Sequence, residues 1–76
     1  MKVTFEQAQR VADRVTRKLG APAWLVGVGV DVDKEEGFAV SVRVLSGKRD
    51  RVKIASRFGG VRVAVVEREP VRALAR

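Results

Sequence analysis

Residues 24–33, WLVGVGVDVD, form the stretch that most constrains what this chain can fold into. Side chains alternate between the two faces of a β-strand, so the stretch predicts a strand over about residues 23–32 with two unlike faces. One face is a continuous apolar rib: Trp24, Val26, Val28, Val30, Val32. The other face consists of Leu25, Gly27, Gly29, Asp31, Asp33. It is nearly bare backbone at the two glycines, where another chain segment or a ligand can approach closely.

A helix is predicted before this strand, over residues 4–19. One apolar stripe recurs at helical spacing along it: Phe5, Ala8, Val11, Ala12, Val15, Leu19. Thr4 is a good N-cap residue and Gln7 lies three positions later, so the two side chains can form a capping box. Gly20 suits a left-handed C-cap, and Pro22 prevents the helix from continuing.

Two more strands, over residues 37–46 and 61–69, are predicted by the same alternation. Residues 34–37 end in glycine and predict a hairpin turn between the first two strands. The inward-facing residues of the two later strands are expected to be Phe38, Val40, Val42, Val44, Val61, Val63, Val65. Residues 46–60 form a basic connection that is compatible with a short strand or one helical turn. It is long enough to cross back over the sheet, so the last strand need not be antiparallel to its predecessor.

This order of elements predicts an α+β fold in a single domain, residues 1–76. One N-terminal helix packs on a three-stranded, mostly antiparallel sheet (α-β-β-β) and covers one face of it. The second face would carry small and mixed residues: Leu25, Gly27, Gly29, Ala39, Ser41, Arg43, Leu45, Ala64, Val66. Such a face is apolar enough to be a contact surface, so self-association through this face or through a sheet edge is one prediction.

The chain lacks the side chains on which most enzymatic catalysis depends. It has no histidine, cysteine or tyrosine, and none of its serines (Ser41, Ser46, Ser56) lies in a nucleophile-elbow pattern. We therefore expect a protein that is not an enzyme, with no cofactor and no small-molecule substrate. There is no run of about 18 apolar residues to span a membrane and no apolar signal core at the N-terminus. Together with the lack of cysteine, this favours a cytoplasmic location.

Two other patterns point to chemistry that we do not expect. A group of acidic residues has oxygen ligands of the kind that calcium or magnesium prefers: Asp31, Asp33, Glu35, Glu36. The group lacks the glycine and the closing glutamate of a calcium loop, and charged hairpin tips are common, so no metal site is predicted. Gly27 and Gly29 lie inside a strand rather than at a strand-to-helix turn, which excludes a dinucleotide or P-loop motif.

The basic connection is the sharpest functional feature of the sequence. The net charge is +7, and five cations lie within ten residues, followed by Phe58: Lys48, Arg49, Arg51, Lys53, Arg57. Arg43 and Arg62 are expected nearby on the open sheet face. Such a patch can neutralise phosphates while Phe58 stacks on a base, or it can pair with the carboxylates of an acidic protein. Aromatic residues make up only 5% of the chain, and Phe58 can equally be a packing anchor. The charge can also reflect a GC-rich or heat-adapted source.

Three short segments resemble a known domain: residues 26–30 (VGVGV), 56–63 (SRFGGVRV) and 69–74 (EPVRAL). With the N-terminal amphipathic helix, they resemble a small bacterial αβββ domain that occurs alone and ahead of trypsin-like peptidase domains. The resemblance covers most of the chain, implies no catalytic residues and implies an accessory or protein-interaction role. The leading prediction is therefore a non-enzymatic module that binds another protein or its own copy, through the sheet face around Gly27 and Gly29 and the basic connection. The alternative is a nucleic-acid-binding module that uses Lys48, Arg49, Arg51, Lys53, Arg57, Arg62.

Overall fold

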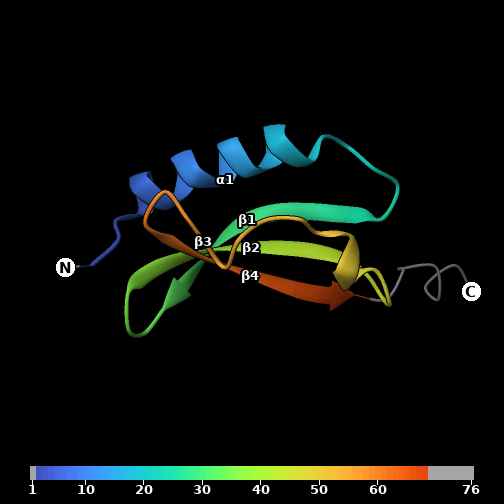
Figure 1. Ribbon diagram of the computed structural model, residues 1–76. Coiled ribbons are helices and arrows are strands. Elements are labelled where there is room, and N and C mark those ends of the chain that lie inside the picture. The colour runs from blue at the N-terminus through green and yellow to red at the C-terminus, as the bar shows by residue number, and fades with distance from the viewer. Residues whose placement is uncertain (1, 69–76) are drawn as a thin grey trace, which may run out of the picture.

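The computed structural model describes residues 2–68 as one helix lying on a curved sheet (Figure 1). The elements are α1 (Phe5–Leu19), β1 (Leu25–Asp33), β2 (Gly37–Leu45), the short 3₁₀ helix η1 (Arg49–Arg51), β3 (Arg57–Phe58) and β4 (Val61–Arg68). The α+β class is confirmed. The prediction of three strands is wrong, because the sheet has four strands in the order β1-β2-β4-β3. Glu69, the predicted end of the last strand, lies outside the described residues.

The sheet is mixed, with a parallel pair at its centre. β1 is antiparallel to β2, and β3 is antiparallel to β4. β2 and β4 run parallel, with Val40 opposite Val63 and Leu45 opposite Arg68. A parallel pair needs a connection that returns along the whole length of the strands. The connection over residues 46–60 does this, and it holds both η1 and the two-residue strand β3.

Helix α1 begins and ends as the sequence predicts. The backbone N–H of Gln7 donates to Thr4 Oγ1 at 3.1 Å, and the N–H of Thr4 donates to Gln7 Oε1 at 2.9 Å, which completes the capping box. At the other end, Gly20 has a φ of +76° and its N–H donates to the Thr16 carbonyl at 2.9 Å. The buried face of the helix consists of Ala8, Val11, Ala12, Val15.

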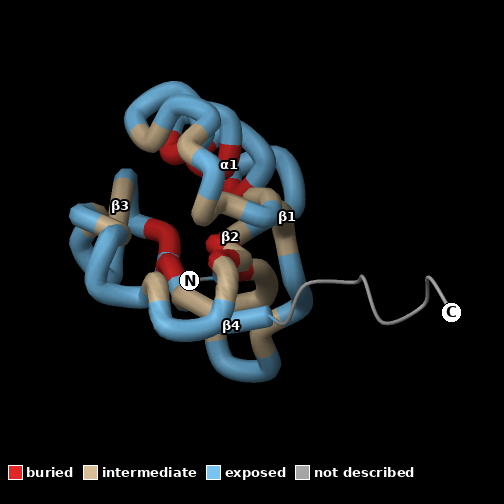
Figure 2. The backbone as a smooth tube through the Cα atoms, turned by 90° about the vertical axis from the view of Figure 1, so that its right-hand side faces the viewer, coloured by how far each residue is buried: buried red, intermediate tan, exposed pale blue. Residues whose placement is uncertain are grey.

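The core lies between α1 and the two central strands, and it is built mainly of valine. Figure 2 shows the buried segments in red on α1, on β2 and at the start of β4. The sheet contributes five strongly buried side chains: Val40, Val42, Val44, Val61, Val63. Burying one such side chain stabilises the fold by about 1.5–3 kcal/mol, so this layer is the main source of stability. β2 is buried on its second face too, at Ala39 and Ser41.

A β-bulge near the start of β1 changes which residues face the core. The register shifts between Leu25, which lies opposite Val44, and Gly27, which lies opposite Arg43. The extra residue, Val26, is 53% exposed, whereas Leu25 packs against the core. The prediction that Val26 faces inward and Leu25 outward is therefore wrong, because a bulge breaks the simple alternation of a strand.

Beyond the bulge, the inner face of β1 follows the predicted alternation only in its central part. Val28 and Val30 pack against the core, as does Trp24 just before the strand. Val32, which the alternation also assigns to the apolar face, is 78% exposed. It lies at the turn end of β1, next to the last pair of the hairpin, Asp33 and Gly37.

Candidate functional site

The basic residues predicted to form one patch lie at two ends of the sheet. The N–H of Ser46 donates to the Arg68 carbonyl at 3.0 Å, and Arg49 Nη2 donates to the Val65 carbonyl at 2.7 Å. These bonds place η1 beside the end of β4. Arg57, in β3, and Arg62, at the start of β4, lie instead beside the turn between β1 and β2. Because β2 and β4 run parallel, the connection must lead from the end of β2 back to the start of β4, and its basic residues are spread along that path.

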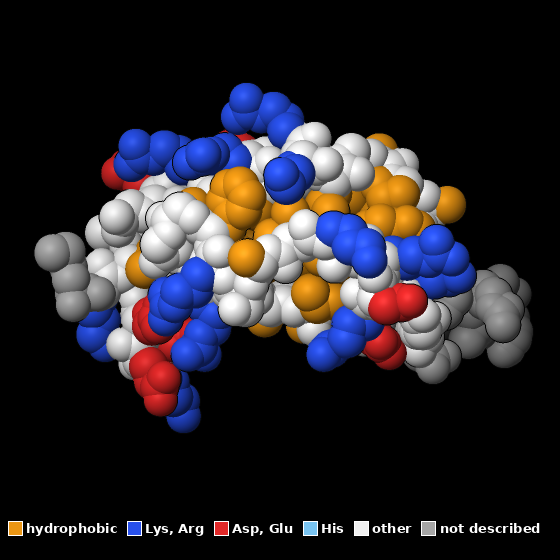
Figure 3. Space-filling model, in the orientation of Figure 1, with side chains coloured by type: hydrophobic (Ala, Val, Ile, Leu, Met, Phe, Trp, Pro, Cys, Tyr) orange, Lys and Arg blue, Asp and Glu red, His pale blue; other side chains and the backbone are white. Residues whose placement is uncertain are grey.

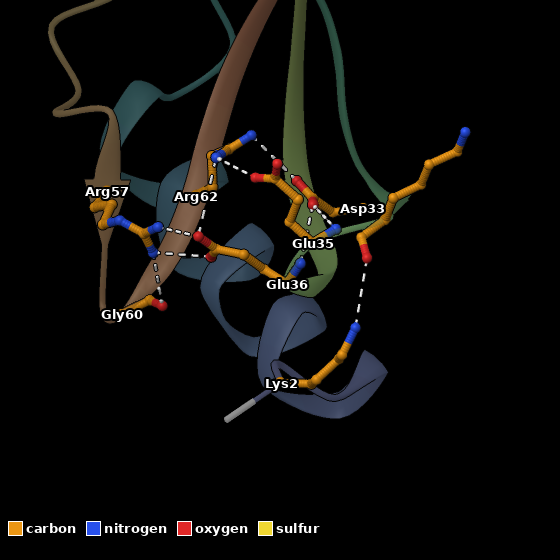
Figure 4. Close-up of polar contacts among 8 residues, drawn as sticks. Lys2, Asp33, Glu35, Glu36, Arg57, Gly60 and Arg62 are labelled. Atoms are coloured by element: carbon orange, nitrogen blue, oxygen red, sulfur yellow. Dashed lines mark hydrogen bonds and ion pairs between the residues drawn. The ribbon is translucent and has the colours of Figure 1, made fainter.

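Arg57 and Arg62 are paired with the acidic turn between β1 and β2, and Figure 4 shows these contacts. Arg62 lies 3.4 Å from Asp33, 3.7 Å from Glu35 and 3.9 Å from Glu36. Arg57 binds Glu36 with both terminal nitrogens, one of them at 2.9 Å from Oε1. We call these five residues the turn cluster. Its three carboxylates against two guanidiniums leave it with no excess of positive charge for a phosphate.

Hydrogen bonds favour the charged form of two carboxylates in the turn cluster, Asp33 and Glu36. The backbone N–H groups of Glu35 and Glu36 donate to Asp33 Oδ1 at 2.8 and 3.0 Å, which lowers the Asp33 pKa, and the nearby Arg62 lowers it further. The hydrogen bond from Arg57 lowers the pKa of Glu36 in the same way. The cluster thus fastens the β1–β2 turn to β3 and β4.

Arg43 covers part of the sheet face that the sequence presents as bare. Its Nη2 lies 3.8 Å from Asp31 Oδ1, and a Cβ built on Gly29 would lie only 3.3 Å from its Nη1. The guanidinium therefore lies across Gly29. At Gly27, by contrast, a Cβ would meet nothing within 4 Å among the described residues. Of the two predicted glycine contacts, only Gly27 leaves open space above the sheet.

Phe58 is held by the rest of the fold. Its half-buried ring packs against the core, and the Arg14 guanidinium carbon lies 5.3 Å from the ring centroid. This cation–π contact occupies a position where a nucleic-acid base would stack. Sequence analysis missed Arg14 because cations near a helix C-terminus also suit the helix dipole. No local pattern links Arg14 to a residue 44 positions later.

The remaining cations of the connection, Lys48, Arg51 and Lys53, form no ion pair within residues 2–68. Figure 3 shows basic side chains over α1 and over η1, with hydrophobic side chains between them. In the connection, Val52, Ile54 and Phe58 are half-buried against the core. We call this surface the basic face: Arg14, Lys48, Arg51, Val52, Lys53, Ile54, Phe58. Acidic residues lie at its end, Asp50 within η1 and Glu67, which is 3.9 Å from Arg49.

Comparison with known proteins finds no matching family model, no matching curated protein and no matching solved structure. Within residues 2–68, no helix has the length and apolar character needed to cross a bilayer. The same part of the chain contains no group of three or more acidic residues placed to hold a metal ion.

Proposed function

We propose that this chain is a non-enzymatic protein-interaction module whose basic face binds an acidic, partly apolar segment of another protein. The observation that carries the proposal is that exposed cations alternate with half-buried apolar residues along residues 51–54 of the connection. Arg51 and Lys53 are exposed and have no carboxylate partner among the described residues, whereas Val52 and Ile54, which alternate with them, are half-buried. A segment with carboxylates and one or two apolar side chains would satisfy both kinds of residue.

The apolar component favours a protein partner over a nucleic acid. Phosphates would engage the cations but would leave the hydrophobic surface without a partner, and Arg14 already lies over the Phe58 ring. Two arginines of the nucleic-acid hypothesis, Arg57 and Arg62, are also held by acidic groups. Binding of nucleic acid should therefore be weak, independent of sequence and strongly reduced by salt.

A direct test compares three fluorescent probes by anisotropy at about 50 and about 200 mM salt, the range over which phosphate contacts weaken most. The probes are a peptide of alternating glutamate and leucine, a glutamate peptide of equal charge without leucine, and a single-stranded oligonucleotide. We expect the leucine-containing peptide to bind most tightly and to keep most of its affinity at the higher salt. An oligonucleotide that binds more tightly than both peptides would favour nucleic-acid binding instead.

Charge variants locate the site. Arg51→Ala with Lys53→Ala should weaken peptide binding about three- to tenfold, the combined effect of two exposed ion pairs. Lys2→Ala with Lys34→Ala removes the same charge at the turn end of the molecule, where Lys2 Nζ lies 3.4 Å from the Lys34 carbonyl. This control should change binding little. Equal losses in the two double variants would show that only net charge matters. Arg49 is unsuitable for this test, because it also holds the Val65 carbonyl.

A further inference from the structure

The two edges of the sheet differ in how their backbone groups are covered. On the β4 side, β3 pairs with Val61 and Arg62, and the N–H of Val63 donates to the Ser56 carbonyl at 2.8 Å. Further along β4, Arg49 Nη2 donates a hydrogen bond to the Val65 carbonyl oxygen at 2.7 Å. β1 is the other edge, nine residues long, and no segment within residues 2–68 forms hydrogen bonds along its outer side. An uncovered edge strand is a template for pairing with another strand.

The exposed hydrophobic side chains gather on this uncovered side. Only three large hydrophobic residues are exposed in the described chain: Phe5 at 53%, Val26 at 53% and Val32 at 78%. Val26 and Val32 belong to β1 itself. Phe5 packs edge-to-face on Phe38, whose β1 partner is Val32. An edge that is both unpaired and apolar is a place where a second chain can add.

We propose that β1 pairs antiparallel with β1 of a second copy, about a two-fold axis that passes through Gly29. Val26 and Val32 lie three positions before and after Gly29. In this register, Val26 lies opposite the partner's Val32, and Val28 opposite the partner's Val30. The exposed Val32 of each copy thereby lies beside the bulge of the partner's edge strand, so the pairing removes part of its exposed surface from water. The pairing extends the four-stranded sheets into one continuous sheet and leaves both basic faces free, so it does not rest on the proposed function.

Charges favour this register over one centred on Asp31. An axis at Asp31 would place two aspartates directly opposite each other, which destabilises a strand pair. With the axis at Gly29, Asp31 lies opposite the partner's Gly27, and Gly27 itself lies next to Arg43 on β2. In the single chain the Arg43 guanidinium lies across Gly29 beside its own Asp31. Since Gly27 has no side chain, the guanidinium has room to turn across it towards the partner's Asp31. The glycines of β1 thus provide room for this pair.

Association is tested on the full chain by sedimentation velocity between about 10 µM and about 1 mM, the affinity range expected of a small interface. We expect a monomer–dimer equilibrium. Val32→Lys should weaken the dimer at least about tenfold while leaving the fold intact, because Val32 is mostly exposed. Ala55→Lys adds the same charge at an exposed position of the connection and should leave association unchanged. A monomer at every concentration, or a Val32→Lys dimer as stable as the parent, would overturn the proposal.

The register is tested by cross-linking, since the chain has no cysteine of its own. Gly27→Cys and Asp31→Cys are made as separate variants of different mass and mixed under mild oxidation; both positions lie on the same face of β1, and a Cβ at Gly27 meets nothing within 4 Å. Opposite residues of an antiparallel pair have Cα atoms about 4.5–5.5 Å apart, within reach of a disulfide. Identical positions would be four residues apart along the strands, about 13 Å. Mixed disulfides should therefore form in preference to disulfides between identical chains; the reverse preference would refute the Gly29 axis.

Discussion

Replacing Val42 by alanine should destabilise the domain far more than the same replacement at Val32. Val42 is fully buried at the centre of β2, whereas Val32 is 78% exposed at the end of β1. Truncating Val42 forfeits the burial of two methyl-sized groups, about 1.6 kcal/mol. A residual cavity of roughly 50 Å³ adds about 1 kcal/mol if the surrounding side chains do not relax. The expected loss is about 3 kcal/mol, a large part of the roughly 4–11 kcal/mol typical of a domain of this length.

The assay is urea unfolding followed by the fluorescence of Trp24. It is the single tryptophan, and it packs against the core. Measurements at about 1 µM protein keep self-association from contributing to the apparent stability. Val32→Ala should cost less than about 0.5 kcal/mol, because little of its side chain is removed from water. Equal losses at the two positions, or a loss below about 1 kcal/mol for Val42→Ala, would refute the assignment of Val42 to the core and Val32 to the free edge.

Three further predictions concern the caps and turns. The pKa values of Asp33 and Glu36 lie below their ordinary values of 3.8 and 4.5. The stability that these two carboxylates supply should therefore be complete above about pH 5, and it should be lost as the pH falls below their ordinary pKa values and through the lowered ones. Urea unfolding at several pH values should show this fall, and Glu36→Gln should flatten it. Thr4→Ala should cost about 1 kcal/mol in thermal or urea unfolding, because the capping box is lost. Gly37→Ala should cost clearly more than Gly47→Ala in the same assay. Both residues have positive φ, but only at Gly37 would a Cβ lie 2.5 Å from a backbone carbonyl oxygen.

The helix and the hairpin were predictable because their signals are local. Thr4 and Gln7 lie within one turn of each other, and their capping box formed as expected. The bulge at Val26 was not predictable, since the alternating valines continue through it without a change of pattern. The sequence allowed a short strand in the connection but could not place it, because the two residues of β3, Arg57 and Phe58, are too few to show any alternation.

The candidate site was predictable in composition but not in arrangement. The sequence shows how many cations the connection carries, but it cannot show which of these cations form ion pairs with acidic groups. Arg57 meets Glu36 and Arg62 meets Asp33 across separations of 21 and 29 residues. Only the parallel pairing of β2 and β4 brings these residues together, and the length of the connection allowed that pairing without requiring it.

The parallel pairing also sets the order in which the domain can assemble. α1 and the β1–β2 hairpin form through contacts between near neighbours, whereas Val40 must meet Val63, 23 positions further along the chain. Closing that loop carries the larger entropic penalty, so β4 and the connection should dock last and open first in local unfolding. The basic face belongs to this late-docking part. A partner bound there would hold closed the segment that opens most readily, and hydrogen exchange of β4 amides would slow as the partner is added.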